Sequence, residues 1–163
     1  MRFNSLTNEE IVNKLNDIKI FMFDLDGVLL KSSQDKENIY RQMKNFCNAL
    51  ESENRFTGII TAGNESELTQ NLNGLENCFV LTSSFNKEKV MKEKLDELGL
   101  DFENLFYMGD GILDIMLLRK AGLSCAPSNA RREVKRTVDI ILDEEESNNI
   151  LDTMILQLSR KIF

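Results

Sequence analysis

The sequence has no histidine and no tryptophan, and it has only one proline and three cysteines among its 163 residues. The lack of histidine excludes serine–histidine and cysteine–histidine hydrolases, and it also excludes zinc sites built on imidazole. Acid–base chemistry would therefore depend on carboxylates, lysine, tyrosine or cysteine. A bound metal would be held by oxygen ligands, which favours Mg²⁺.

Long apolar segments and an excess of basic residues are also missing. No apolar stretch reaches the length of a membrane span, and the first ten residues lack the apolar core of a signal peptide. The net charge is −7 and the pI is near 4.8, which argues against nucleic acid or an anionic membrane as a partner. We expect a cytoplasmic protein, and these features leave homo-oligomer formation open.

The cysteines are widely spaced and form no Cys-x-x-Cys pair. We interpret Cys47, Cys78 and Cys125 as small buried residues of a reducing compartment, and a reactive thiol is the less favoured alternative. Hydrophobic residues make up 42% of the chain and charged residues 29%, as in globular proteins. The length predicts a single domain over residues 1–163.

Apolar runs alternate with segments of helical periodicity along the chain. Strands are expected over residues 18–23, 56–61, 78–82, 105–108, 122–126 and 138–142. Helices are expected from a capping box at Thr7 onward, and over residues 37–50, 65–72 (capped by Asn64), 87–98, 112–121, 130–137 and 149–162. Residues 30–36 and 143–146 are interpreted as a polar loop and a solvated turn. The alternation predicts an α/β, Rossmann-like fold, with a mainly parallel sheet and helices on both faces.

Two carboxylates follow the first of these strands. Asp24 stands at its carboxyl end, Asp26 points to the same side two residues later, and Gly27 allows a tight turn. One carboxylate can attack as a nucleophile and hold a metal, while the other donates and accepts a proton. The alternative is a pair of solvated acids in a loop.

Other polar residues stand at the ends of later strands or the starts of helices. Thr61 ends the second strand, and Lys87 opens a helix where its charge is unfavourable for the helix dipole. Asp110 lies between two glycines, and Asp114 follows one turn later. Ligands bind at the carboxyl edge of open α/β sheets, so these residues are candidates for a site. The alternatives are a solvated lysine for Lys87 and a charge match to the helix start for Asp114.

Together these motifs resemble the haloacid dehalogenase superfamily of phosphotransferases. The matching residues are Asp-Leu-Asp-Gly-Val at 24–28, Thr61, Lys87 and Gly-Asp-x-x-x-Asp at 109–114, in the order that the family has. The resemblance covers nearly the whole chain. It implies a haloacid dehalogenase-type fold and a Mg²⁺-dependent phosphatase that acts on a small phosphorylated metabolite.

The resemblance also implies a role for each residue. Asp24 is the expected nucleophile, which forms an aspartyl-phosphate, and Asp26 is the expected general acid for the leaving group and base for water. Thr61 and Lys87 are expected to bind the phosphate. The expected Mg²⁺ ligands are Asp24, the backbone carbonyl of Asp26, and Asp110, with Asp114 in support.

The gaps between the motifs leave no room for a cap domain. The chain therefore resembles the capless branch, which includes phosphatases of 3-deoxy-D-manno-octulosonate 8-phosphate, and residues 122–130 look similar to a loop of theirs. Two departures put the sugar-acid substrate and their tetramer in doubt. The stretch after the first motif has a helical pattern where those enzymes carry a Gly-rich hairpin, and Glu-Glu-Glu-Ser-Asn at 144–148 replaces their Gly-Gly-Arg-Gly.

Two other classes of function fit part of the pattern. A phosphoaspartate signalling module of the receiver type also uses acids, a threonine or serine, and a lysine at strand ends. Asp26 discriminates against it, because a general acid makes turnover possible. A non-catalytic binding subunit that keeps the fold is the third interpretation.

Overall fold

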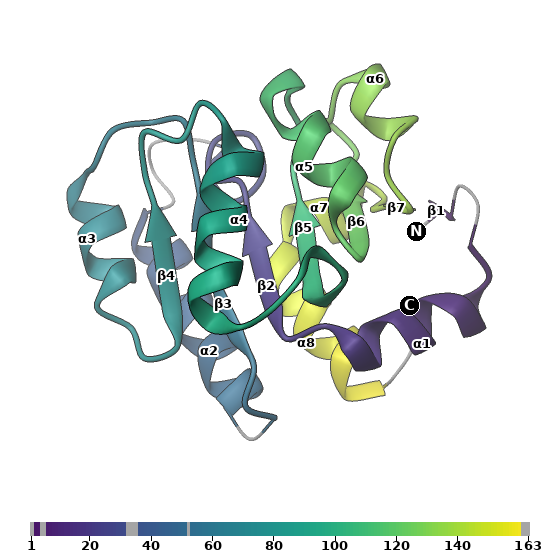
Figure 1. The fold of residues 1–163 in the computed structure, drawn as a ribbon, viewed down its shortest axis with the longest axis horizontal. Coiled ribbons are helices and arrows are strands. Elements are labelled where there is room, and N and C mark those ends of the chain that lie inside the picture. The colour runs from purple at the N-terminus through teal and green to yellow at the C-terminus, as the bar shows by residue number, and fades with distance from the viewer. Residues whose placement is uncertain (1, 4–5, 32–35, 52, 161–163) are drawn as a thin grey trace.

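The computed structural model describes residues 2–3, 6–31, 36–51 and 53–160, which form a seven-stranded sheet (Figure 1). The strand order is β1-β7-β6-β5-β2-β3-β4. Strands β2 to β7 run parallel to one another, and β1 pairs antiparallel with β7. Their bounds are β1 (Arg2–Phe3), β2 (Ile20–Phe23), β3 (Phe56–Ile60), β4 (Cys78–Leu81), β5 (Leu105–Met108), β6 (Leu123–Ala126) and β7 (Ile140–Ile141).

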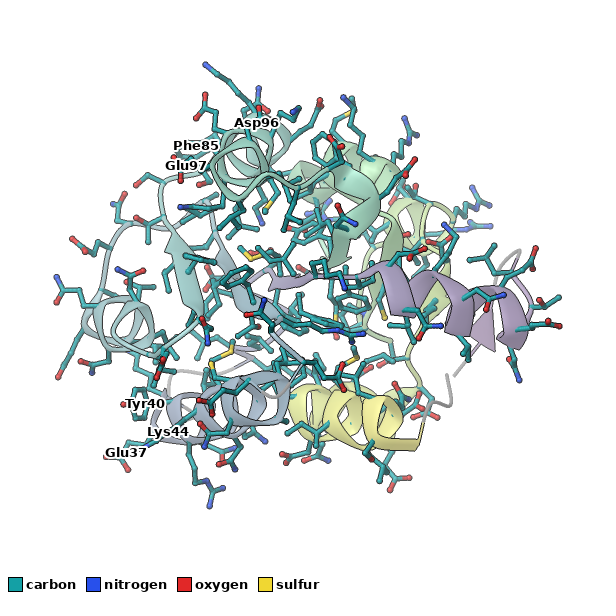
Figure 2. The ribbon with its side chains drawn as sticks, turned by 60° about the horizontal axis from the view of Figure 1, so that its bottom comes forward. Glu37, Tyr40, Lys44, Phe85, Asp96 and Glu97 are labelled. Carbon is teal, nitrogen blue, oxygen red and sulfur yellow. The ribbon has the colours of Figure 1, made fainter. Side chains whose placement is uncertain are left out.

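Helices cover both faces of the sheet. The α-helices of the described ranges are α1 (Asn8–Asp17), α2 (Lys36–Glu51), α3 (Glu67–Asn73), α4 (Lys87–Leu98), α5 (Ile115–Lys120), α6 (Arg132–Lys135), α7 (Glu144–Asn148) and α8 (Ile150–Arg160). Short 3₁₀ turns precede β5 and α5, η1 (Phe102–Asn104) and η2 (Ile112–Asp114). Figure 2 shows α2 and α4 on opposite sides of the sheet, with Lys44 on one helix and Asp96 on the other facing outward.

Alternate side chains of β2 point to opposite faces of the sheet, which explains why helices cover both faces. Phe21 and Phe23 belong to the core beneath α1, α2, α3 and α8, while Ile20 and Met22 belong to the core beneath α4, α5 and α6. All four residues are fully buried, as expected for a central parallel strand. The α/β, Rossmann-like prediction is therefore confirmed.

The connections around β3 contain no inserted domain among the described residues. The described part of the β2–β3 connection forms one helix, α2, and the β3–β4 connection forms one helix, α3. The expected polar loop over residues 30–36 lies largely outside the described residues. None of the helices that the structure describes is long and apolar enough to cross a bilayer.

The helix starts show where local prediction succeeded and failed. Thr7 caps α1 in the predicted capping box. The predicted cap Asn64 is wrong, because Ser66 caps α3 by accepting a hydrogen bond from the amide of Thr69. Asp143 is not part of a solvated turn, since its carboxylate caps α7 in a capping box with Glu146. Both corrections have one cause: a side-chain oxygen placed three residues before a free amide starts the helix there.

The remaining differences concern short or irregular segments. The helix expected over residues 112–121 begins as the 3₁₀ turn η2 before it becomes α5. Strand β1 was not predicted, because two residues are too short to show a period. The last helix begins at Ile150, and the final two residues of its predicted range lie outside the described part of the chain.

Candidate active site

The candidate site lies at the carboxyl ends of three neighbouring strands. In register, Phe23 of central β2 pairs with Ile59 of β3 and Met108 of β5, so these strands end at the same edge. Asp24 follows β2 directly, Thr61 follows β3 directly, and Asp110 stands two residues beyond the end of β5. The parallel register of these strands therefore places Asp24, Thr61 and Asp110 at the same edge of the sheet.

Lys87, the first residue of α4, joins two of the carboxylates. Its Nζ lies 2.8 Å from Oδ1 of Asp24 and 2.6 Å from Oδ1 of Asp114. The Lys87 side chain is 2% exposed, so the solvated alternative is wrong for this lysine. The two carboxylates offset the unfavourable placement of a cation at a helix start.

Asp114 holds several parts of the site in position. Its Oδ1 accepts hydrogen bonds from Lys87 and, at 2.5 Å, from the hydroxyl of Tyr107. Its Oδ2 accepts bonds from the backbone amides of Asp110 at 3.1 Å and Gly111 at 2.8 Å. Both oxygens are thus occupied by donors, so Asp114 acts as a positioning residue and not as a mere charge match to a helix start.

Tyr107 is a member of this network that the sequence analysis missed. It lies in β5, fully buried, and its hydroxyl also accepts a bond from Lys87 at 3.3 Å. A tyrosine in a buried strand three residues before the candidate acid Asp110 was the available signal, because a buried hydroxyl needs a polar partner.

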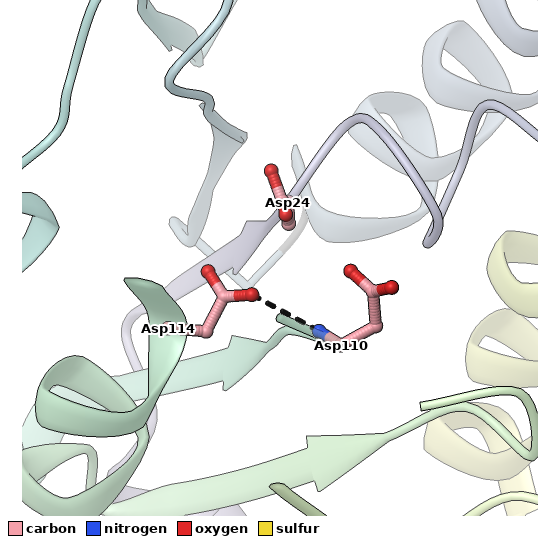
Figure 3. A group of neighbouring side chains, drawn as sticks. All are labelled: Asp24, Asp110 and Asp114. Atoms are coloured by element: carbon pink, nitrogen blue, oxygen red, sulfur yellow. Dashed lines mark hydrogen bonds between the residues drawn. The ribbon is translucent and has the colours of Figure 1, made fainter. Parts of the chain in front are cut away.

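Asp24, Asp110 and Asp114 form a cluster of carboxylates, with one oxygen of each within 4.8 Å of the others (Figure 3). Among the described residues, no other residue donates a hydrogen bond to the Asp110 carboxylate. Gly27 has φ +86°, and a Cβ at that position would collide with this carboxylate, so glycine lets the loop after β2 close over it. Carboxylate oxygens at this spacing fit a hard cation such as Mg²⁺.

Burial and mutual repulsion change the acidity of the cluster. Burial, and next the charge of Asp114, raise the pKa of Asp24 to about 7, although Lys87 acts in the opposite direction. The same two causes raise the pKa of Asp110. Lys87 therefore does not fully offset the burial and repulsion that act on Asp24 and Asp110, and a bound cation would favour the ionised forms of these two residues.

Asp26 and Thr61 contact each other at the same edge of the sheet. The hydroxyl of Thr61 donates to Oδ2 of Asp26 at 3.3 Å and accepts from the amide of Gly63 at 3.0 Å. Thr61 is buried, whereas Asp26 is exposed. The structure thus brings all of the predicted site residues to one edge of the sheet, and their catalytic roles stay predictions.

A pocket of about 410 Å³ adjoins the loop after β2. It is lined by Gly27, Leu30, Lys31, Ser128, Asn129, Glu144 and Asn148. The side-chain amide of Asn129 donates to the carbonyl of Gly27 at 3.0 Å and connects the pocket to the site. The sequence does not show that these residues lie together, because only the fold brings the loop after β6 and helix α7 to the loop after β2.

Several curated proteins match a short part of the chain, among them two phosphatases. Phosphoglycolate phosphatase of Methanopyrus kandleri is 42% identical over 55 residues, which cover 34% of this chain and 24% of that protein. The 5-amino-6-(5-phospho-D-ribitylamino)uracil phosphatase of Bacillus subtilis is 40% identical over 58 residues, which cover 36% and 23%. The chain thus matches about a quarter of the length of these relatives.

Solved structures match over nearly the whole chain. The 3-deoxy-D-manno-octulosonate 8-phosphate phosphatase of Moraxella catarrhalis, in complex with magnesium, phosphate and KDO, has a TM-score of 0.73, 21% identity and 91% coverage of each chain. A putative hydrolase of subfamily III A from Legionella pneumophila has a TM-score of 0.75 and 21% identity, with coverage of 94% of this chain and 90% of its own. At this identity the likeness establishes the fold. Residues 31–154 match the family of haloacid dehalogenase-like hydrolases, and the chain belongs to that family.

Proposed function

We propose that this chain is a Mg²⁺-dependent phosphatase that hydrolyses a small phosphomonoester through an aspartyl-phosphate on Asp24. The observation that carries the proposal is the buried Lys87, which contacts Asp24 and Asp114 while Asp110 completes the carboxylate cluster. This arrangement offers a nucleophile, a fixed cation and oxygen donors for a metal within one partly buried site. The proposed unit is a single domain over residues 1–163 that acts in the cytoplasm.

The chemistry of the donors supports a metal here. Asp24, Asp110 and the backbone carbonyl of Asp26 are the proposed ligands, and Asp114, whose two oxygens accept four hydrogen bonds, is the proposed supporting residue. When bound, Mg²⁺ would neutralise the charge of the phosphoryl oxygens and orient them. Lys87 and the hydroxyl of Thr61 would contact the same oxygens from the other side.

The proposed reaction has two steps. First, a carboxylate oxygen of Asp24 attacks phosphorus and the bond to the leaving alcohol breaks, while Asp26 gives that alcohol oxygen a proton. Second, Asp26 takes a proton from water, whose oxygen attacks phosphorus and breaks the bond to Asp24, releasing phosphate. The exposure of Asp26 beside Thr61 supports this role, because the residue must reach both the leaving group and water.

The pocket beside Gly27 supports a hydroxylated leaving group. Five of its seven lining residues have amide, hydroxyl or charged side chains, and such groups can bind sugar-like hydroxyls. Because structural neighbours include phosphatases of 3-deoxy-D-manno-octulosonate 8-phosphate, we propose a sugar-acid phosphate as the first class to test. Because one curated relative is a phosphoglycolate phosphatase, we propose phosphoglycolate as the second compound to test.

Phosphate release from p-nitrophenyl phosphate, with and without Mg²⁺, tests the proposal. We expect Mg²⁺-dependent turnover in the wild type and none in Asp24→Asn. A receiver-like module would instead take up phosphate from acetyl phosphate without sustained turnover, and a binding subunit would do neither. Absence of turnover across the aryl, sugar-acid and phosphoglycolate substrates would contradict the phosphatase proposal.

A further inference from the structure

Cys47 and Cys78 lie together in the fold although they are far apart in the sequence. Cys47 lies on α2, and Cys78 is the first residue of the edge strand β4. Met43, one turn before Cys47 on the same face of α2, contacts the hydroxyl of Thr57 through its sulfur at 3.9 Å. Thr57 is the register partner of Cys78 in the sheet. This face of α2 therefore packs on the start of β3, beside the start of β4. Cys47 and Cys78 belong to the same cluster of buried side chains, and each thiol shifts the pKa of the other.

A pocket gives solvent access to Cys47. It has a volume of about 210 Å³ and is lined by α2 and by the loop that leads into Cys78, namely Lys44, Cys47, Asn48, Glu51, Gly74, Leu75, Glu76 and Asn77. Cys47 lines the pocket, whereas Cys78 does not, although its neighbour Asn77 does. Cys125 provides a contrast, because it is fully buried in the interior strand β6. A small oxidant can therefore reach Cys47 first.

The three thiols also differ in acidity. The hydrogen bond from Cys78 lowers the pKa of Cys47, and the same contact, together with burial, raises the pKa of Cys78. Burial raises the pKa of Cys125. Because the thiolate is the reactive form of cysteine, reactivity is concentrated on the thiol that faces the pocket.

We propose that Cys47 and Cys78 are a peroxide-reactive dithiol whose oxidation joins α2 to β4 through a disulfide. The Cys47 thiolate attacks one oxygen of hydrogen peroxide, the O–O bond breaks, and hydroxide leaves, so Cys47 becomes a sulfenic acid. The Cys78 sulfur then attacks the Cys47 sulfur, the S–O bond breaks, and water leaves with the Cys78 proton. Two thiols are oxidised to one disulfide while one peroxide is reduced to two molecules of water.

The dithiol is remote from the candidate active site. Cys78 begins its strand, whereas the proposed catalytic residues follow the carboxyl ends of theirs. Cys47 lies in the second half of α2, which returns toward the same amino edge of the sheet. The inference therefore does not depend on the phosphatase proposal, and its test needs no activity assay.

The test begins with brief treatment of the native wild-type protein with hydrogen peroxide. The protein is then unfolded in a first alkylating reagent, reduced, and labelled with a second reagent before peptide mass spectrometry. We expect the second label on Cys47 and Cys78 in equal amounts and the first label on Cys125. A peptide linked through Cys47 and Cys78, lighter by two hydrogen atoms, should appear before reduction.

Two variants resolve the order of events. Cys125→Ala should behave as the wild type does. Cys78→Ala should stop at a sulfenic acid on Cys47, which dimedone traps. If all three wild-type cysteines carry only the first label, or if the second label falls on Cys125 or on a link between two chains, the proposal is wrong. The wild-type measurement decides this even where a variant fails to fold.

Discussion

Two acidic regions of this molecule differ in almost every respect. Asp24, Asp110 and Asp114 are scattered along the sequence, yet the sheet gathers their oxygens within 4.8 Å of one another. The run from Asp143 to Glu146 is contiguous, yet it forms the cap and first turn of α7. Burial raises the pKa of Asp24, whereas the backbone amide of Glu146 lowers the pKa of Asp143.

The difference shows which acids carry chemistry in this fold. At the start of α7 each carboxylate meets water or a free amide, so charge stabilises the helix. At the strand ends, burial and repulsion oppose ionisation, and a buried lysine is needed to offset part of the cost. In this fold, acidic residues at strand ends therefore indicate a functional site, whereas a contiguous run of acidic residues does not. Substitutions in the two regions can test this comparison.

Asp24→Asn should have the largest effect. An amide is a poor nucleophile and a poor metal ligand, so we expect phosphate release to be abolished while the fold is retained. Steady-state phosphate release and circular dichroism measure the two outcomes. Asp143→Asn is the matched control, since it makes the same chemical change in the other acidic region and should keep the wild-type rate. A rate of phosphate release near that of the wild type in Asp24→Asn would contradict the assignment of Asp24 as the nucleophile.

Asp26→Asn should lower turnover by roughly 10²–10⁴, the usual contribution of general acid–base catalysis. Its side chain is exposed, so we expect no loss of folding. The proposed metal contact runs through its backbone, so the Mg²⁺-induced rise in melting temperature should persist. A variant that fails to fold would instead assign Asp26 a structural role.

Lys87→Ala should weaken binding of a phosphate analogue such as vanadate by roughly tenfold or more, as for a lost charge-assisted hydrogen bond. It should also destabilise the fold by about 3–5 kcal/mol, because two buried carboxylates lose their partner. Lys89→Ala is the control, since the Lys89 side chain is 72% exposed and lies beside Glu93 on the surface of α4. Isothermal titration and chemical denaturation measure these effects. If Lys89→Ala produced them and Lys87→Ala did not, the assignment of the clamp would be wrong.

Sequence patterns predicted which residues stand at strand ends better than they predicted the side-chain contacts within the site. The buried runs and helical periods placed Asp24, Thr61 and Asp110 at strand ends, because these features depend on local order along the chain. The partners of Lys87 were hidden, since its two ion pairs join residues from three separate elements. Tyr107 was missed for the same reason. The helix start at Asp143 was a different failure, because a usable local signal was interpreted as a solvated turn.

Mg²⁺ should raise the melting temperature, and more so at about pH 8 than at about pH 5.5. Folding raises the pKa of Asp24 to about 7, so its stabilising contribution in the metal-free protein is complete at low pH and is lost as the pH rises toward that value. Metal binding needs the ionised form of the Asp24 carboxyl, so binding should be favoured above that pKa, where the carboxyl has already lost its proton. At a hundred times Kd the gain is about 2.7 kcal/mol.

Scanning fluorimetry across pH, with and without Mg²⁺, measures this effect. Asp110→Ala should lose the response to Mg²⁺, whereas Asp143→Ala should keep it. A melting temperature indifferent to millimolar Mg²⁺ in the wild type would argue against the metal site.

Asp143→Ala should have the smallest effect. It removes the side chain that accepts the amide of Glu146, so we expect the melting temperature to fall by a few degrees at most. Asp143→Ser should recover most of that loss, because serine also caps helices. Thr7→Ala, which breaks the capping box of α1, should cause a loss of similar size. Phosphate release should be unchanged in all three variants. A fall in turnover comparable to that of Asp26→Asn would place the acidic run in the active site, and the contrast between the two regions would fail.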